Sequence, residues 1–322
     1  MSATQATVVD NRTKRQVARD TRRNEATAHK KLTSKGATIA AAVIALFWTI
    51  PTFGLFVTSF RPGADTQNSG WWTVFSNPEF TFDNYVQAWN SGGTSTTLAT
   101  AFINSLAITI PATVFPIVMA ALAAYAFAWI DFKGRNMLFI FVFALQIVPL
   151  QMALVPLLSL FSDGLTINDV PIFPGFGLNE VQYSFARVWI AHAIFALPLA
   201  TFMLHNFISE IPGEIIEAAR VDGAGHGQVF FRIILPLAAP AIASFAIFQF
   251  LWVWNDLLVG LTFAGPGSRP LTVAVAEMAG SRGGDWHVLT AGAFISMVVP
   301  LIVFISLQRY FVRGLLAGSV KG

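Results

Sequence analysis

The sequence predicts an all-α protein that crosses a membrane six times, and three observations lead to this fold class. Of its 322 residues, 55% are hydrophobic and only 11% are charged, whereas soluble domains average roughly 25% charged residues. Six stretches are long and apolar enough to cross a bilayer, which takes about 20 residues of helix. The basic residues gather in the segments that six crossings would place on one side of the membrane.

Residues 1–36 precede the first crossing and form a polar, basic arm. Nine of the 20 Lys and Arg residues come before Ala37. This composition predicts a mostly disordered, cytoplasmic arm. Its charges either touch anionic lipid head groups or only fix the orientation of the chain. The apolar run after the arm is too long for a cleavable signal peptide.

The transmembrane domain is predicted over residues 37–312, followed by a short cytoplasmic tail at 313–322. Pro51 is expected to kink the first span. Pro111 and Pro116 predict a bend or an interfacial turn in the second, and Arg187 is expected to reach the interface from the start of the fourth. The six predicted spans are residues 37–60, 98–130, 137–161, 185–207, 237–263 and 289–311.

The distribution of positive charge predicts which side of the membrane each loop faces. Four basic residues fall on one side, and the other 16 fall on the opposite side. The four are Arg61, Arg187, Arg269 and Arg282. Because loops rich in Lys and Arg stay in the cytoplasm, both termini are predicted to be cytoplasmic. The long loops at 61–93, 162–184 and 264–288 then face outward.

One cytoplasmic segment, residues 209–236, interrupts the apolar second half of the chain with several charges. Its first helix is expected to carry Glu217 near the positive end of the helix dipole and to end at Gly223. A second short helix is expected from about His226 to just before Pro236. The segment is therefore predicted to be a helix–turn–helix knob at the membrane surface, or else an ordinary amphipathic loop. The residues expected to share one apolar face are Ile215, Ile216 and Ala219.

The knob contains a spaced pattern made of Glu217, Ala218, Ala219, Gly223, Ile233, Leu235 and Pro236. This pattern resembles the EAA loop of ABC-importer permeases. The resemblance implies a type I importer permease fold, in which this loop docks into a cleft on an ATPase subunit. It also implies that Glu217 pairs with a basic residue of the ATPase, that Ala218 and Ala219 permit close approach, and that Gly223 makes the turn.

The chain ends with small residues, and the last five are Gly318, Ser319, Val320, Lys321 and Gly322. This tail resembles the end of MalG-type sugar permeases. The resemblance implies that the tail extends into the ATPase pair, where a chain of small side chains fits a narrow crevice. The alternative is a frayed terminus after the last helix.

Two further stretches, residues 245–258 and 280–294, resemble the α-glucoside branch of the same family. The resemblance implies a permease subunit of an ATP-driven importer for an oligosaccharide, an α-glucoside such as maltose or trehalose, in a bacterial inner or plasma membrane. The implied partners are a second homologous permease, two ATPase subunits and an extracytoplasmic sugar-binding protein. The chain itself is expected to bind no cofactor, because ATP and Mg would be held by the ATPases.

Polar residues inside the predicted spans are candidates for the sugar path. Trp254, Asn255 and Asp256 combine an aromatic face with polar groups, as carbohydrate sites do. They also fall near the outer interface, where an interfacial cap or a helix-packing pair is the alternative. Amides within a membrane more often bond across helices than to substrate. The residues to which this weaker interpretation applies are Gln146, Gln151, Asn104 and Ser105.

The sequence argues against an enzyme and against nucleic-acid binding. There is no cysteine, so neither a disulfide nor a thiolate metal site can form. The five histidines are scattered without metal-ligand spacing, and no folded nucleic-acid-binding module accompanies the basic arm. The G-x-x-x-x-G-K-[ST] phosphate loop is absent, so ATP hydrolysis must come from a partner. A secondary transporter driven by an ion gradient is the alternative, although neither inverted repeats nor mid-membrane charges stand out.

Overall fold

The computed structural model describes residues 35–92, 96–177, 183–281 and 285–317. The predicted arm at 1–36 falls almost entirely outside these residues, and so do the last five residues. The chain divides into two units, residues 1–57 and 58–322. In the first unit the described part belongs to helix α2 (Lys35–Ser59), which contains Pro51 and is long and apolar enough to cross a membrane.

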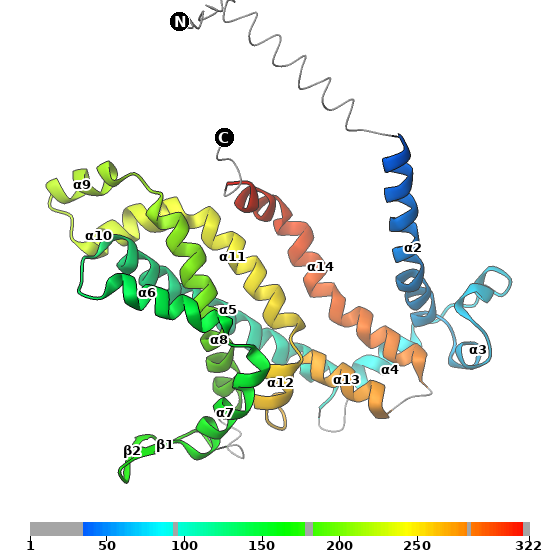
Figure 1. Cartoon of the computed structure of the whole chain (residues 1–322). Coiled ribbons are helices and arrows are strands. Elements are labelled where there is room, and N and C mark those ends of the chain that lie inside the picture. Colours follow the sequence, from blue (N-terminus) through cyan, green and yellow to red (C-terminus); the bar gives the residue numbers. More distant parts are fainter. Residues whose placement is uncertain (1–34, 93–95, 178–182, 282–284, 318–322) are drawn as a thin grey trace, which may run out of the picture. The chain divides into compact units, whose positions relative to one another are not determined.

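Helices dominate the second unit (Figure 1). The long ones are α5 (Leu98–Trp129), α8 (Ser184–Ser209), α11 (Leu235–Asn255) and α14 (Trp286–Ala317). Helix α5 packs most extensively against α8, and α11 packs against α5, α8 and α14. Among the described residues, five helices including α2 are long and apolar enough to span a bilayer, and a bent helix pair brings the total to as many as six. The predicted all-α membrane architecture is therefore confirmed.

The third predicted span is not a single helix, which corrects the sequence-based expectation. It consists of α6 (Arg135–Ala144) with the 3-10 turn η2 (Leu145–Ile147), followed by α7 (Leu150–Asp163), and the two halves meet at 103°. Val148 is extended, with φ −70° and ψ 118°. A residue that precedes a proline is pushed out of the helical region, and here that proline is Pro149. The break therefore falls at a residue whose backbone preference is extended.

Helix α5, in contrast, continues without a break through Pro111 and Pro116, so the expected interfacial turn is absent from it. A proline removes the hydrogen bond to the carbonyl four residues earlier. These carbonyls belong to Ala107 and Ala112, and neighbouring helices supply the missing donors. The indole N–H of Trp189 donates to Ala107 over 2.9 Å, and the amide of Gln249 donates to Ala112 over 3.3 Å.

The fifth span also differs from its predicted bounds. The helix is continuous from His226 to Asn255, so the second helix of the knob does not end before Pro236. It passes through α10 (His226–Val229) and the π-helical turn η4 (Phe230–Ile234) into α11. The wide π turn directly before Pro236 accommodates the proline ring and its missing donor.

At its other end α11 stops at Asn255, eight residues before the expected end of the span. The carboxylate of Asp256 accepts hydrogen bonds from the backbone N–H groups of Val259, over 2.8 Å, and Gly260, over 3.3 Å. Asp256 therefore caps a separate short helix, α12 (Leu258–Phe263).

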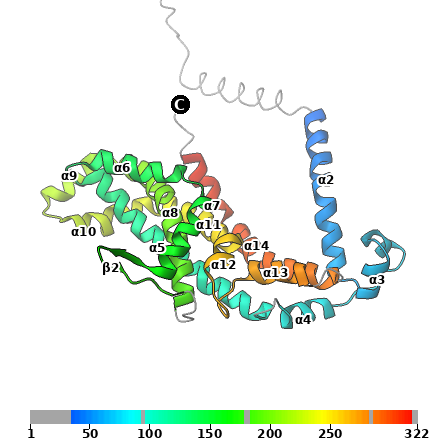
Figure 2. The same cartoon turned by 60° about the horizontal axis from the view of Figure 1, so that its bottom comes forward.

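The loops predicted to face outward contain more regular structure than the sequence predicts. They hold α3 (Gly63–Asn68), η1 (Trp71–Phe75), α4 (Asp83–Asn90), α13 (Leu271–Ser281) and an antiparallel hairpin of β1 (Leu165–Ile167) and β2 (Val170–Phe173). Figure 2 shows α4 and α13 at the end of the spans opposite α9 (Gly213–Val221). Both pack against α5 and α14.

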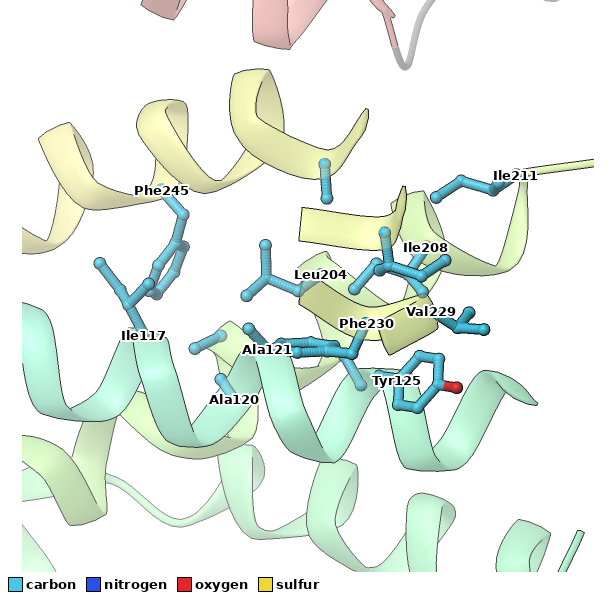
Figure 3. Packing of buried hydrophobic residues seen from close by; sticks show 14 of the residues in the cluster. Ile117, Ala120, Ala121, Tyr125, Leu204, Ile208, Ile211, Val229, Phe230 and Phe245 are labelled. Atoms are coloured by element: carbon cyan, nitrogen blue, oxygen red, sulfur yellow. The ribbon is translucent and has the colours of Figure 1, made fainter. Parts of the chain in front are cut away.

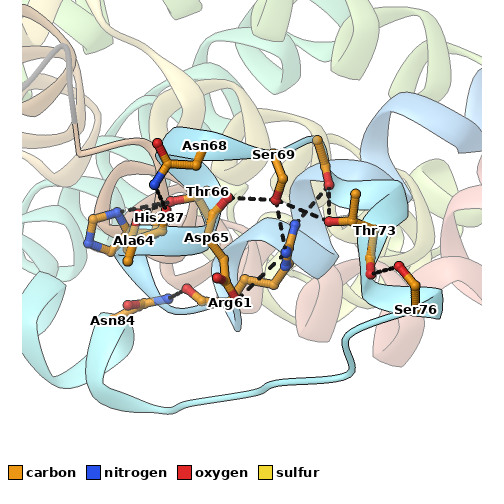
Figure 4. A network of polar contacts seen from close by, with 12 residues as sticks. Arg61, Ala64, Asp65, Thr66, Asn68, Ser69, Thr73, Ser76, Asn84 and His287 are labelled. Atoms are coloured by element: carbon orange, nitrogen blue, oxygen red, sulfur yellow. Dashed lines mark hydrogen bonds and ion pairs between the residues drawn. The ribbon is translucent and has the colours of Figure 1, made fainter.

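Buried polar side chains hold these outer loops in place. Arg61 is only 1% exposed and donates to the carbonyl of Gly70, over 2.8 Å, and to the hydroxyl of Ser69, over 3.2 Å (Figure 4). The backbone carbonyl of Arg61 in turn accepts a hydrogen bond from Asn84. A buried guanidinium requires such partners.

Arg187 is also buried, at 1% exposure, so the expectation that it reaches the interface is wrong. Its guanidinium donates to the carbonyls of Gly177 and Phe263. From α5, Asn104 donates to the carbonyls of Gly267 and Arg269. These bonds anchor the link between α12 and α13 on α5 and α8, which is the cross-helix role expected for an amide in this position.

Candidate coupling site and substrate path

The turn at the tip of the knob is a Schellman motif that requires glycine. Helix α9 ends with the N–H of Gly223 bonded to the carbonyl of Arg220 and the N–H of Ala224 bonded to that of Ala219, at 3.0 and 2.9 Å. Gly223 has φ +86°, and a Cβ added there would meet no atom within 4 Å. The requirement for glycine is therefore conformational and not steric. This confirms the predicted turn at Gly223.

The underside of the knob packs onto the ends of α5 and α8. Figure 3 shows Ile211, Val229 and Phe230 of the knob gathered with Tyr125 of α5 and Leu204 of α8. All five are at most 8% exposed. Burial of large apolar side chains contributes about 1.5–3 kcal/mol each relative to exposure. The knob is therefore a continuation of the packed helical core.

Two polar contacts fasten the same region. The hydroxyl of Tyr125 lies 2.9 Å from Nδ1 of His226, at the start of α10. The indole N–H of Trp129 donates to the carbonyl of Ile208 near the end of α8, over 3.2 Å. The knob is thus joined to α5, to α8 and, through its continuous helix, to α11.

The opposite face of α9 is exposed. Glu217 and Ala218 are on this face, and Val221 is 87% exposed at its end. Ile216 is buried and Ala219 is half-buried, but Ile215 is 42% exposed, so the expectation that these three residues share one face is wrong for Ile215. The two side chains of Ile215 and Ile216 point about 100° apart around the helix, and Ile216 is the one that packs into the core. An apolar and acidic surface therefore remains uncovered within the described chain.

The structure brings only part of the EAA-like pattern together at this surface. Ala219, Ile233 and Leu235 are half-buried against the apolar cluster beneath the knob, while Pro236 is exposed on α11. The tail residues 318–322 lie outside the described residues. The predicted coupling roles are not tested by these positions and stay predictions.

The three candidates at the end of α11 have separate surroundings. Trp254 is 2% exposed, packs against Phe102 and Phe250, and donates its indole N–H to the carbonyl of Ser296 over 3.0 Å. The exposed side chain of Asn255 bonds back to its own helix, and Asp256 caps α12. The alternatives of cap and packing contact account for these contacts, and the proposed role in the sugar path stays a prediction.

Of the two glutamines in the broken third span, Gln146 lines a hollow that Gln151 does not line. This hollow of about 370 Å³ lies where η2 and α7 meet, and residues of α8 and Trp252 of α11 also line it. Gln151 is exposed elsewhere on α7. Sequence reasoning missed Trp252, although its position two residues before Trp254 turns it about 200° away on the same helix.

Among the described residues, no group of three or more His, Asp or Glu side chains is placed to hold a metal ion. The candidate site therefore consists of the exposed face of α9 and a mostly apolar hollow.

Comparison with known proteins defines the class. A model of the family described as binding-protein-dependent transport system inner membrane component matches residues 112–316, and the chain belongs to this family. It is a sugar ABC transporter permease, a multi-pass protein of the inner membrane. Members of this family are transport subunits and not enzymes. The resemblance identified from the sequence is thereby confirmed.

Three relatives show which permeases this chain is similar to. The chain is 50% identical over 289 residues to the osmoprotective compounds uptake permease protein GgtD of Synechocystis sp., covering 88% of this chain and 91% of the relative. It is 51% identical over 252 residues to the α-glucoside transport system permease protein AglG of Rhizobium meliloti, covering 78% and 63%. The trehalose transport system permease protein SugB of Mycobacterium tuberculosis is 32% identical over 277 residues, covering 85% and 92%.

The fold is similar to a solved structure of a bacterial ABC transporter that imports the acidic polysaccharide alginate. The TM-score is 0.65 at 19% identity, and the match covers 88% of this chain and 98% of that chain. A second structure of an alginate ABC transporter, in complex with a periplasmic protein that carries an alginate pentasaccharide, matches equally well at 17% identity.

Proposed function

We propose that this chain forms, with a second homologous permease, the membrane pathway of an ATP-driven importer for α-glucosides such as maltose or trehalose. Two ATPase subunits bind on the cytoplasmic side and hold ATP and Mg, while an extracytoplasmic binding protein delivers the sugar. The names of AglG and SugB support this substrate class. The family description and the alginate complex support delivery by a binding protein.

The exposed face of α9 is the observation that carries the proposal. It places Glu217 beside small and apolar side chains, and Val221 is 87% exposed. Apolar surface rimmed by charge is typical of a protein-binding site. In the proposed complex Glu217 pairs with a basic residue of the ATPase, and Ala218 allows the close approach.

The connections of the knob suggest how ATP hydrolysis is used. Because its underside is buried with Tyr125 and Leu204 and its second helix continues into α11, a displacement of α9 moves these helices with it. Packed cores switch between discrete arrangements and do not deform continuously. ATPase closure thus reorients the spans as rigid bodies and changes which side of the membrane the path opens to.

The orientation of the chain follows from its charges. The basic residues favour the side of the membrane that holds the knob, so the knob faces the ATP-containing compartment. The tail at 318–322 is proposed to enter the ATPase pair, on the strength of its resemblance to the tails of MalG-type permeases.

Uptake in a deletion strain tests the proposal. Labelled maltose, trehalose and sucrose are offered to cells that lack this chain and to cells in which it is restored. Uptake of at least one α-glucoside is expected to depend on the chain and to disappear when the ATPase genes are deleted. Uptake that persists without the ATPases would instead support a transporter driven by an ion gradient.

A further inference from the structure

The hollow at the break of the third span has walls from three helices that are far apart in the sequence. Val148 and Pro149 come from the break, Ile194 and Pro198 from α8, and Trp252 from α11. Its volume of about 370 Å³ falls within the roughly 300–1,000 Å³ typical of small-molecule sites. Proline and aliphatic side chains make most of the wall apolar.

Trp252 differs from Trp254, two residues later, because its indole N–H and part of its ring surface are available to a ligand. The indole N–H of Trp254 is used by Ser296, and its ring is enclosed. Trp252 is only half-buried, and within the described chain no group accepts a hydrogen bond from its indole N–H. The ring of His192 stands edge-on to it, with ring centroids 6.3 Å apart at 81°. The ring is thus supported from behind while part of its surface faces the hollow.

Gln146 supplies a polar group on the same hollow. Its side chain is exposed, and no hydrogen bond joins its amide to another described residue. An amide offers two donors and a carbonyl acceptor. The lining contains no Asp, Glu, Lys or Arg among the described residues, and an unpaired charge would be costly against apolar walls. A neutral ligand with hydroxyl groups is therefore favoured over an acidic one.

A pyranose ring matches this combination. It has an apolar face of C–H groups, which packs on an aromatic ring, and a rim of hydroxyls, which bonds to an amide or an indole N–H. Building on the transport function proposed above, we infer that this hollow is a sugar subsite of the path. A glucosyl ring packs on Trp252, and Gln146 bonds to its hydroxyls. The subsite thus belongs to this subunit and lies on the face of α11 away from Trp254.

The absence of cysteine from the chain allows a direct test in the intact importer. Ala153→Cys places a single thiol in this subunit, on the lining of the hollow and at a residue with no proposed sugar contact. Its modification by a maleimide is followed by mass spectrometry of the subunit. Maltose and trehalose are supplied with the binding protein under turnover. The transported sugar is expected to slow modification several-fold. Gln151→Cys, which is exposed but outside the hollow, serves as the matched control and should be unaffected by the sugar.

Variants of Trp252 distinguish packing of its ring against the sugar from a purely structural role of the side chain. Trp252→Ala is expected to abolish the protection of Ala153→Cys and to lower the uptake rate about tenfold, corresponding to about 1.4 kcal/mol. Trp252→Phe keeps an aromatic face and should recover part of both. Trp286→Ala removes an exposed tryptophan at the start of α14 and should change neither. Amounts of assembled complex are compared by purification, and only variants that assemble at the level of the parent are interpreted.

The outcomes distinguish this inference from the proposed function. Normal sugar uptake without protection of Ala153→Cys, or with full protection in Trp252→Ala, would overturn the subsite while leaving the importer intact. Failure of the unmodified complex to transport either sugar would instead contradict the proposed substrate class. Protection that is lost in Trp252→Ala and partly restored in Trp252→Phe would establish the subsite.

Discussion

The indole N–H of Trp254 in α11 donates to the carbonyl of Ser296 in α14, and Pro300 leaves that same carbonyl without its helical donor. The pairs of Trp189 with Ala107 and Gln249 with Ala112 repeat this relationship in α5. In lipid, an unsatisfied backbone group is costly because water cannot replace the donor. These side chains therefore allow long helices to contain prolines, and they fix the contacts between neighbouring spans.

Trp254→Phe should destabilise the protein by about 1–3 kcal/mol, because it leaves a buried carbonyl without a partner while it keeps the aromatic packing. In a protein that carries Pro300→Ala, a helical N–H bonds to the same carbonyl. Trp254→Phe should therefore reduce the free energy of unfolding by less in that background. A double-mutant cycle on thermal unfolding in detergent measures the coupling. Equal costs of Trp254→Phe with and without Pro300 would refute this explanation.

Gly223→Ala should reduce uptake several-fold and weaken the knob by about 1 kcal/mol, since an L side chain is strained at a positive φ of this size. Gly225→Ala is the matched control, because Gly225 has φ −76° and also has open space around its Cβ position. Sugar uptake is measured for both variants at equal amounts of assembled complex. Equal activities would mean that the Schellman turn is not required for coupling.

Tyr125→Phe removes only the hydroxyl that meets His226 and keeps the buried ring. Loss of one such hydrogen bond should cost about 0.5–1.5 kcal/mol. If the knob transmits motion through this contact, the ATP hydrolysed per sugar transported should rise. The ratio is measured in proteoliposomes that contain the full importer. An unchanged ratio would show that the apolar packing alone transmits the motion.

Glu217→Lys should weaken binding of the ATPase subunits with little effect on folding, because exposed substitutions usually change stability by less than about 0.5 kcal/mol. Co-purification of the ATPase with the permease is the measurement. Glu214→Lys changes the same charge on the first turn of α9 and is expected to have a smaller effect. Equal loss of ATPase in both variants would indicate a general electrostatic contribution instead of a specific pair.

Much of this architecture could be predicted from the sequence, because composition and apolar runs determine which segments can cross a bilayer. The turn at Gly223 was predictable for a similar reason, since few other residues adopt its φ. Prolines were the main source of error. Pro149 breaks its span, whereas Pro111 and Pro116 do not, and the difference depends on donors from α8 and α11 that are far away in the sequence.

The burial of individual polar residues was equally difficult to predict from the sequence. A single arginine near the start of a span usually reaches the interface, but Arg187 donates to carbonyls in a loop and at the end of α12 that no local pattern reveals. Local sequence patterns likewise favoured Trp254 over Trp252 as a candidate for the sugar path. Both are tryptophans on one helix, and only the surrounding helices show that one is enclosed while the other faces a hollow.

The central claim, that the exposed face of α9 binds an ATPase subunit, is tested most directly by site-specific cross-linking. A photoreactive maleimide is attached to Val221→Cys, which would be the only thiol of this chain, in the intact importer. The account predicts an adduct with the ATPase and none from Asn68→Cys in the outer loop. Complexes that contain the ATPase but yield no adduct from Val221→Cys would contradict it.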